Sequence, residues 1–283
     1  MIKILDNTPI ETYCLKDYFP VYVKREDLSC PAPGPPFAKV RGLYTRMKHL
    51  KEIENVHTVG YTETSISMAG WGVAWVAKEL GMRAVIYDPQ YKNPPELLLY
   101  HREQWKKFGA VLEPIKAGMA KVNYNICSKL LHKKYGDDAV MFPLGLPFIE
   151  TIDAVAREAV ASNLTQFGTI VTCVGSGTMC AGILRGLMEG PKVERSIALY
   201  GIITRSGDFL AKRKRIMDKV EFADLFYPKI NFTIIDTGYE YTQIEKEPCP
   251  FPCHPYYDRK AWKWMVDNHH LLNGPVLFWN IGA

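Results

Sequence analysis

The sequence predicts an α/β fold in which mostly parallel β-sheet structure is covered by helices. Short β-branched apolar runs alternate with amphipathic stretches of helical period along the chain, which is typical of βαβ units. The length of 283 residues suffices for one large domain or two intertwined ones. Hydrophobic residues make up 47% and charged residues 23% of the chain, which is the composition of a globular protein.

Nine short apolar segments, rich in β-branched and aromatic residues, are predicted to be strands. They are Val21–Val23, Val56–Tyr61, Ala84–Tyr87, Val111–Pro114, Val140–Phe142, Ile170–Val174, Ala198–Ile203, Phe232–Ile235 and Val276–Trp279. Seven amphipathic stretches are predicted to be helices. They are Val40–Lys51, Ala69–Leu80, Pro94–Phe108, Val122–Tyr135, Ile149–Asn163, Met179–Met188 and Arg259–Asn268. Gly81 and Gly109 follow two of them as C-terminal glycines, because glycine adopts a left-handed φ without steric hindrance.

Composition also limits the setting in which the chain works. No run of eighteen apolar residues is present, so no membrane span is expected. Residues 1–6 lack the apolar stretch of a secretory signal, and seven cysteines without regular spacing favour reduced thiols in the cytoplasm. Cys249, Cys253 and His254 resemble half of a zinc site, but no second pair of ligands follows at a suitable spacing. A proline-stiffened loop is the better interpretation, and no metal is expected.

The formal net charge is +5, and much of it lies in three short patches. These are Lys106-Lys107, Lys133-Lys134 and Lys212–Arg215. Such patches are usually solvated helix faces. They can also attract an anionic partner such as nucleic acid, and charge alone does not separate the two interpretations.

Lys39 stands where an extended segment turns into a helix. The proline-rich run 31–36 fixes how the chain enters that helix, and Phe37 and Ala38 lead directly to the lysine. A helix N-terminus carries partial positive charge, which disfavours an ammonium and favours the neutral amine needed to form an imine. Most lysines are surface residues, so this position needs a second signal to indicate catalysis.

The second signal is a glycine-rich turn, Gly175-Ser176-Gly177-Thr178, between the apolar segment Thr169–Val174 and a predicted helix. Glycines allow backbone N–H groups to approach a phosphate, and Thr178 adds a hydroxyl donor. The turn is not a Rossmann fingerprint, because it lies in the second half of the chain, and no Walker lysine follows it. An imine-forming lysine together with a separate phosphate-binding turn predicts an enzyme that uses pyridoxal 5′-phosphate.

The order and spacing of several motifs resemble the tryptophan synthase β-subunit superfamily, the fold type II pyridoxal phosphate enzymes. The closest patterns are those of 1-aminocyclopropane-1-carboxylate deaminase and D-cysteine desulfhydrase. The resemblance covers most of the chain. Its motifs are Thr8-Pro9, Tyr22–Asp27, Lys39–Arg41, Val73–Met82, Gly175–Gly182, Pro255–Ala261 and Phe278–Gly282.

The resemblance implies roles for particular residues. Lys39 would hold the cofactor through an imine and then act as general base at the substrate Cα, while Gly175, Ser176, Gly177 and Thr178 would bind its phosphate. Tyr257 matches a tyrosine that lies over the cofactor and exchanges a proton. The alternative interpretation, to which we give equal weight, is that Tyr257 is a buried aromatic residue of the core.

The loop that would receive the substrate carboxylate departs from the family pattern. It contains Thr64, Ser65 and Ser67, and Met68 stands where the relatives have an asparagine that bonds the ring oxygen of the cofactor. Ser67 matches the catalytic serine of this loop. The simpler interpretation is that the three hydroxyls cap the next helix.

The C-terminus departs as well. Ile281 stands where the relatives have a threonine that contacts the pyridine nitrogen, so Asn280 or no residue would make this contact. A neutral pyridine is a weaker electron sink, which suits eliminations.

The resemblance implies a large cofactor-binding domain of residues 1–42 and 146–283 and a small inserted domain of residues 43–145, with the cofactor in the cleft between them. The predicted activity is that of a lyase or deaminase which forms an aldimine with an amino acid and cleaves a Cα bond. One alternative is a phage-type enzyme that tailors, for example by decarboxylation, an amino-acid group attached to a thymine base in DNA. Another is an impaired binding protein of the same fold. The relatives also imply a homodimer.

Overall fold

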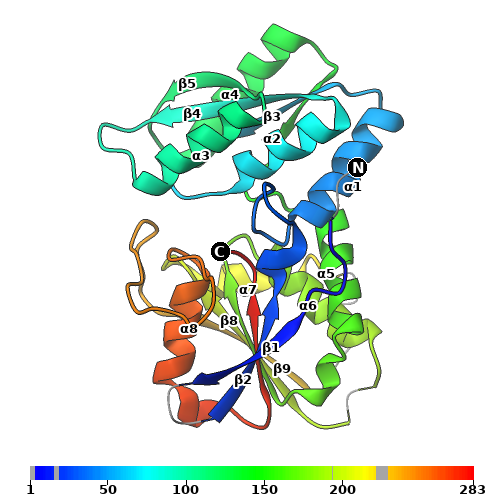
Figure 1. Ribbon diagram of the computed structural model, residues 1–283, viewed down its shortest axis with the longest axis vertical. Helices are drawn as coiled ribbons and strands as arrows, with labels where there is room; N and C mark the ends of the chain where they lie inside the picture. The colour runs from blue at the N-terminus through cyan, green and yellow to red at the C-terminus, as the bar shows by residue number, and fades with distance from the viewer. Residues whose placement is uncertain (1–3, 16–18, 193, 221–228) are drawn as a thin grey trace. The chain divides into compact units, whose positions relative to one another are not determined.

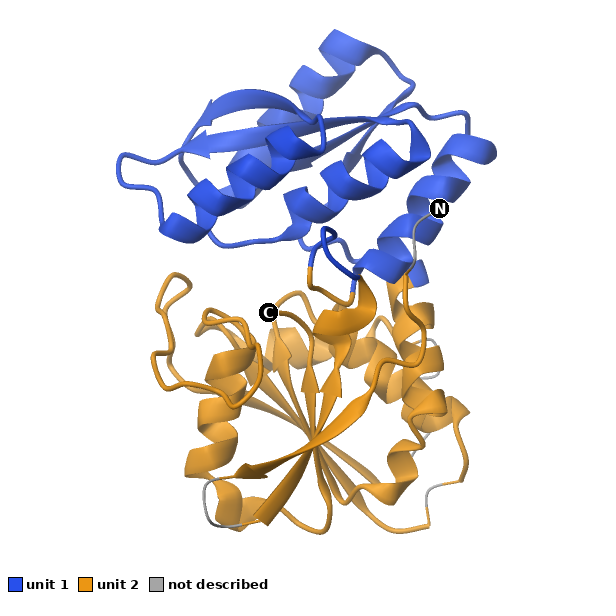
Figure 2. Cartoon of the chain, in the orientation of Figure 1, with its two compact units in different colours: residues 1–3, 31–35, 39–150 blue, residues 4–30, 36–38, 151–283 orange. Residues whose placement is uncertain are grey.

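The computed structural model describes residues 4–15, 19–192, 194–220 and 229–283. No secretory signal is predicted in residues 1–6, and the first three of these residues lie outside the described residues. The chain forms two compact units (Figure 2). The first contains residues 31–35 and 39–150, and the second contains residues 4–30, 36–38 and 151–283.

The first unit contains a four-stranded parallel sheet. Its strands are β3 (Thr58–Thr62), β4 (Arg83–Gln90), β5 (Val111–Lys116) and β6 (Ala139–Phe142), in the order β5-β4-β3-β6. Its helices are α1 (Val40–Glu52), α2 (Ala69–Leu80), α3 (Glu96–Lys107) and α4 (Ala120–Tyr135). A parallel sheet buries both faces under its crossover helices.

Alternating side chains of the sheet meet different helices. Val85 and Tyr87 of β4 pack with Leu131 of α4 on one face, and the intervening residues of β4 therefore point to the opposite face. Figure 1 shows α2 and α3 together on that opposite face. The first unit is thus a three-layer αβα arrangement.

The second unit contains a six-stranded sheet in the order β1-β2-β10-β7-β8-β9. The strands are β1 (Ile10–Leu15), β2 (Phe19–Arg25), β7 (Thr169–Val174), β8 (Ile197–Ile203), β9 (Ile230–Asp236) and β10 (Val276–Asn280). Only the β1–β2 pair is antiparallel among these pairings. Because β7, β8, β9 and β10 run parallel, their carboxyl ends meet at one edge, where α/β sheets bind ligands.

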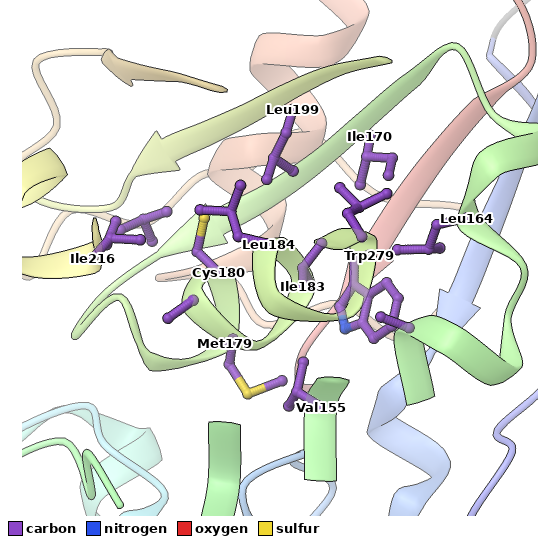
Figure 3. Close-up of a cluster of buried hydrophobic side chains, with 14 of the residues drawn as sticks. Val155, Leu164, Ile170, Met179, Cys180, Ile183, Leu184, Leu199, Ile216 and Trp279 are labelled. Carbon is purple, nitrogen blue, oxygen red and sulfur yellow. The ribbon is translucent and has the colours of Figure 1, made fainter. Parts of the chain in front are cut away.

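Helices cover both faces of this larger sheet. One face carries a core beneath α5 (Ile149–Ala161) and α6 (Thr178–Glu189), in which Ile183 and Leu184 pack with Ile170 of β7 (Figure 3). The other face packs against α8 (Asp258–Asp267), which inserts Trp262 and Met265. Figure 1 shows α8 on one side of the sheet and α5 and α6 on the other.

The structure confirms the predicted mostly parallel α/β fold, and among the described residues a strand and an α-helix that were not predicted are also present. One is the edge strand β1 (Ile10–Leu15), which pairs with β2. The other is α7 (Phe209–Met217), which contains the basic patch Lys212–Arg215. Most predicted elements are present with ends that differ by a few residues. Within the described residues, no helix combines the length and the apolar character that crossing a membrane requires.

Candidate functional site

Lys39 lies at the predicted entry of a helix. It is the N-cap residue of α1, and its carbonyl accepts a hydrogen bond from the N–H of Leu43. The preceding residue belongs to the second unit, where the N–H of Ala38 donates to the carbonyl of Ile281 at 3.1 Å. The chain therefore passes from one unit to the other at the peptide bond before Lys39.

The side chain of Lys39 is half-buried, and a hydrogen bond to the turn after β6 holds it in place. Its Nζ donates to the carbonyl oxygen of Gly145 at 2.6 Å. The N–H of Gly145 in turn donates to the hydroxyl of Tyr61 in β3 at 3.2 Å. The amine is thus held at the carboxyl ends of β3 and β6, inside the first unit.

The loop between β3 and α2 is organised by Glu63, which sequence reasoning missed. Its carboxylate accepts the N–H of Thr64 at 2.8 Å and the N–H of Gly70 at 2.6 Å, so one side chain joins both ends of the loop. Burial raises the pKa of Glu63 to about 8, although these hydrogen bonds and one from Ser67 oppose that rise. A Cβ on residue 70 would collide with the Glu63 carboxylate, so Gly70 makes this closure possible.

The predicted carboxylate-binding hydroxyls lie in this loop, and those of Ser65 and Ser67 have partners inside the first unit. Ser67 hydrogen-bonds to Glu63, and its Oγ also accepts the N–H of Ala69 at 3.1 Å. Ser67 thus accepts the first N–H of α2, while Met68 is the N-cap residue of that helix. Ser65 is buried and hydrogen-bonds to Tyr91, whereas Thr64 is half-buried.

The predicted phosphate-binding turn has the expected position in the second unit. Gly175, Ser176 and Gly177 connect the carboxyl end of β7 to α6, and Gly177 has a φ of 85°. Ser176 Oγ and Thr178 Oγ1 lie 3.0 Å apart. No residue with a Cβ fits at Gly177, because the Cβ would lie 2.6 Å from Ile216 Cγ1.

Two lysines that sequence reasoning did not assign to this turn bind its carbonyl groups. Lys212 Nζ donates to the carbonyl of Gly175 at 2.6 Å, and Lys219 Nζ donates to the carbonyl of Ser176 at 3.4 Å. Burial and the neighbouring cations Arg215 and Lys219 lower the pKa of Lys212. The turn therefore lies in a positively charged environment, as a phosphate site requires.

Asn280 is fully buried at the carboxyl end of β10. Its Nδ2 donates to Asp27 Oδ1 at 2.9 Å and to the carbonyl of Pro252 at 3.0 Å. Both partners are acceptors, which fixes the orientation of the amide. Within the described residues, Asn280 Oδ1 has no hydrogen-bond partner, so a buried acceptor is left for a ligand.

Asp258 is a second buried acceptor at the same edge, and sequence reasoning missed it as well. Its Oδ1 accepts the N–H of Ile281 at 2.8 Å, while its Oδ2 has no partner among the described residues. Burial raises the pKa of Asp258 to about 7. Its position directly after Tyr257 in a predicted site motif was the signal that could have identified it.

Tyr257 is half-buried and is the N-cap residue of α8. Its ring packs against that of His254, with 4.7 Å between centroids, and against the core beneath α8. The structure therefore assigns the ring a packing role, and a role for the phenol in proton transfer stays a prediction.

The predicted site residues are divided between the two units. Lys39, Thr64, Ser65 and Ser67 belong to the first unit. The second unit contains Gly175, Ser176, Gly177, Thr178, Tyr257 and Asn280. This set fits pyridoxal phosphate in chemical type: a primary amine for its aldehyde, a glycine turn for its phosphate and buried acceptors for a protonated ring nitrogen.

Comparisons with known proteins agree with this chemistry. The family described as "Pyridoxal-phosphate dependent enzyme" matches residues 5–237. The glycyl-dTMP PLP-dependent decarboxylase of Pseudomonas phage M6 is 38% identical over 290 residues, covering 99% of each chain. A putative 1-aminocyclopropane-1-carboxylate deaminase of Thermotoga maritima is 24% identical and covers 94% of this chain and 89% of the relative.

Solved structures show the same fold. A structure described as an ACC deaminase homologue has a TM-score of 0.76 at 20% identity, covering 99% of this chain and 90% of the other. A hydrogen sulfide-producing enzyme of Fusobacterium nucleatum has a TM-score of 0.69 at 15% identity, with coverage of 99% and 96%.

Proposed function

The chain belongs to the pyridoxal-phosphate dependent enzyme family, within fold type II, and from this premise we propose that it decarboxylates an amino-acid group carried on a thymidine nucleotide. The observation that carries this proposal is the match to the phage decarboxylase, which extends over 99% of both chains at 38% identity. The deaminase relative is more distant, at 24% identity.

Lys39 and the glycine turn supply the two anchors that the cofactor needs. Pyridoxal phosphate supplies an aldehyde that condenses with amines and a ring that accepts the electron pair of a broken Cα bond. Lys39 offers its amine at the N-terminus of α1. Backbone N–H groups at the start of α6 and the hydroxyl of Thr178 are suited to hold the phosphate.

Asp258 and Asn280 are proposed to face the ring nitrogen. Asp258 Oδ2 and Asn280 Oδ1 are buried acceptors without partners among the described residues, at the carboxyl end of β10. An acceptor stabilises a protonated ring nitrogen, which strengthens the ring as an electron sink. This revises the expectation of a neutral ring that followed from Ile281 alone.

The loop at Glu63 supports loss of the substrate carboxylate better than its retention. The hydroxyls of Ser65 and Ser67 already have partners within the first unit, and the Glu63 carboxyl group of the same loop accepts two of its backbone N–H groups. Such a loop offers fewer donors to an anionic carboxylate than the predicted hydroxyl cluster. Since a reaction is slowed by interactions that stabilise the reactant more than the transition state, a loop that holds the carboxylate weakly does not oppose its loss as carbon dioxide.

Decarboxylation also requires a proton at Cα after carbon dioxide has left. The Lys39 amine and the Tyr257 phenol are the proposed donors, since both groups exchange protons in enzymes. Tyr257 directly precedes Asp258 at the start of α8, so α8 places both side chains at the same end of one element.

The proposal is tested by incubating the cofactor-loaded protein with an oligonucleotide that carries a glycyl-modified thymidine. We expect mass spectrometry to show loss of carbon dioxide from the nucleotide. The Lys39→Ala variant should lose both this activity and the visible absorption band of the bound cofactor.

Free amino acids provide the matched comparison. Release of ammonia or of an eliminated group from a free amino acid, with the modified oligonucleotide left intact, would contradict the proposal. That result would favour the lyase or deaminase activity that the sequence first predicted.

A further inference from the structure

One side of α7 packs against the glycine turn. Lys212 and Ile216 are four residues apart and Lys219 follows three residues later, so all three point the same way from the helix and the turn that extends it. Ile216 is fully buried against the position where Gly177 lacks a Cβ. The two lysines therefore precede and follow Ile216 in the sequence and lie on its side of the segment.

The lysines bind the carbonyl oxygens of two consecutive peptide units. Lys212 Nζ lies 2.6 Å from the oxygen of Gly175, and Lys219 Nζ lies 3.4 Å from the oxygen of Ser176. In a trans peptide, the C=O of one residue and the N–H of the next point in opposite directions. The N–H groups of Ser176 and Gly177 therefore point away from the two ammonium groups.

One of these two N–H groups is available to a ligand. Within the described residues, no hydrogen-bond partner occurs for the N–H of Gly177. An ammonium group on a carbonyl also polarises the peptide unit, which strengthens the N–H of that unit as a donor. Both effects increase the affinity of the turn for an anion.

The positive charges of the two lysines are also incompletely balanced by nearby carboxylates. Within the described part of the chain, Lys212 has no carboxylate partner. Burial and the neighbouring cations lower the pKa of Lys212 and of Lys219, although Asp218 opposes the change at Lys219. A bound dianion would relieve this mutual repulsion.

We propose that Lys212 and Lys219 are positioning residues that fix the Gly175–Gly177 turn as a phosphate cup, by orienting the two peptide units whose N–H groups receive the phosphate. The assignment of the cup to the cofactor's phosphate rests on the proposed function.

The experiment compares pyridoxal phosphate with pyridoxal, which has the same aldehyde and no phosphate. Apo protein is titrated with each compound, and binding is followed by visible absorbance. We expect Lys212→Met to weaken the binding of pyridoxal phosphate by about tenfold, as for loss of a charge-assisted hydrogen bond. Its affinity for pyridoxal should not change. Lys219→Met should act in the same direction, with a smaller effect because its hydrogen bond is longer.

Lys214→Met is the matched control, because Lys214 lies on the same helix but is 75% exposed and paired with Asp218. This variant should bind pyridoxal phosphate like the wild-type protein. Circular dichroism and thermal unfolding establish that each variant is folded. Calorimetry with inorganic phosphate gives a second readout that does not depend on imine formation.

Each result has one interpretation. Wild-type protein that fails to prefer pyridoxal phosphate over pyridoxal would contradict the assignment of the cup, and so part of the proposed function. Wild-type protein with this preference and lysine variants that retain it fully would overturn only the present inference. Unchanged cofactor affinity with weakened DNA binding would instead assign the lysines to the phosphates of nucleic acid.

Discussion

Glu63 is a fully buried acid whose surroundings favour its protonated form. Its two oxygen atoms accept N–H groups from both ends of the loop between β3 and α2, yet burial raises its pKa to about 8. Asp88 lies near enough to raise the pKa further. The acid therefore changes charge near neutral pH, inside a loop proposed to lie at the substrate.

This raised pKa makes the stability of the protein depend on pH in a definite direction. Above the ordinary pKa of 4.5, the unfolded chain releases the Glu63 proton, while the folded protein retains it up to about pH 8. The folded state is therefore destabilised progressively as the pH rises through this window. Glu63→Gln removes this titration. We expect the stability of the wild-type protein relative to Glu63→Gln to fall between pH 5 and pH 8, measured by urea unfolding.

The control is Glu103→Gln, because Glu103 lies on α3 with 69% of its side chain exposed. The difference in stability between this variant and the wild-type protein should stay nearly constant over the same window. Parallel pH profiles for the wild-type protein and Glu63→Gln would show that Glu63 does not hold its proton in the folded state.

The residues that sequence reasoning found and those it missed differ in a physical respect. Lys39 and the 175–178 turn were identified as candidates because each stands at a boundary between elements, which the local sequence encodes. Glu63 and Asp258 were missed because burial makes them unusual, and burial depends on distant residues. Asp258, for example, receives a hydrogen bond from Ile281, 23 residues away.

At the scale of elements, α5 and α6 approach each other through glycine. A Cβ at Gly182 of α6 would lie 2.5 Å from Val155 Cβ and 2.9 Å from the carbonyl oxygen of Ile152, both on α5. Gly186, one turn further, also faces α5. The close crossing holds α6, whose N-terminus carries the glycine turn, against the sheet core shown in Figure 3.

Gly182→Ala is expected to destabilise the protein despite its better helix propensity. Alanine is favoured over glycine inside a helix by roughly 1 kcal/mol. The added methyl group must displace α5, and such overpacking costs about 1–3 kcal/mol. Urea unfolding should therefore show a lower free energy of unfolding. Gly207→Ala is the control, since a Cβ there meets no atom within 4 Å. Equal effects of the two substitutions would refute the close crossing.

The two elements that the sequence did not predict have weak local signals. Strand β1 (Ile10–Leu15) is an edge strand whose side chains are mostly half-exposed, so no apolar run marks it. Helix α7 (Phe209–Met217) contains four consecutive basic residues and buries only Ile216. Its basic run suggested a solvated surface. In the structure, Lys212 from that run binds the glycine turn.

At the scale of the whole molecule, the order of strands and helices was predictable because parallel sheets need crossover helices, and both leave periodic patterns. The order of strands within each sheet was not, since β10 lies between β2 and β7 through pairings far apart in sequence. The candidate site follows this topology, because the carboxyl ends of β7 and β10 meet at one edge of the sheet.

The net charge of +5 provides a test of the substrate class that does not depend on catalysis. A protein that acts on modified thymidine in DNA must contact phosphates, and binding to a polyanion releases counterions. We expect duplex DNA to bind at low salt, with the logarithm of the association constant falling linearly as the logarithm of salt concentration rises. Fluorescence anisotropy over a salt series measures this slope. The mononucleotide dTMP is the control, because one phosphate monoester releases few counterions and should show little salt dependence. Absence of DNA binding even at low salt would restrict the substrate to a free nucleotide or amino acid.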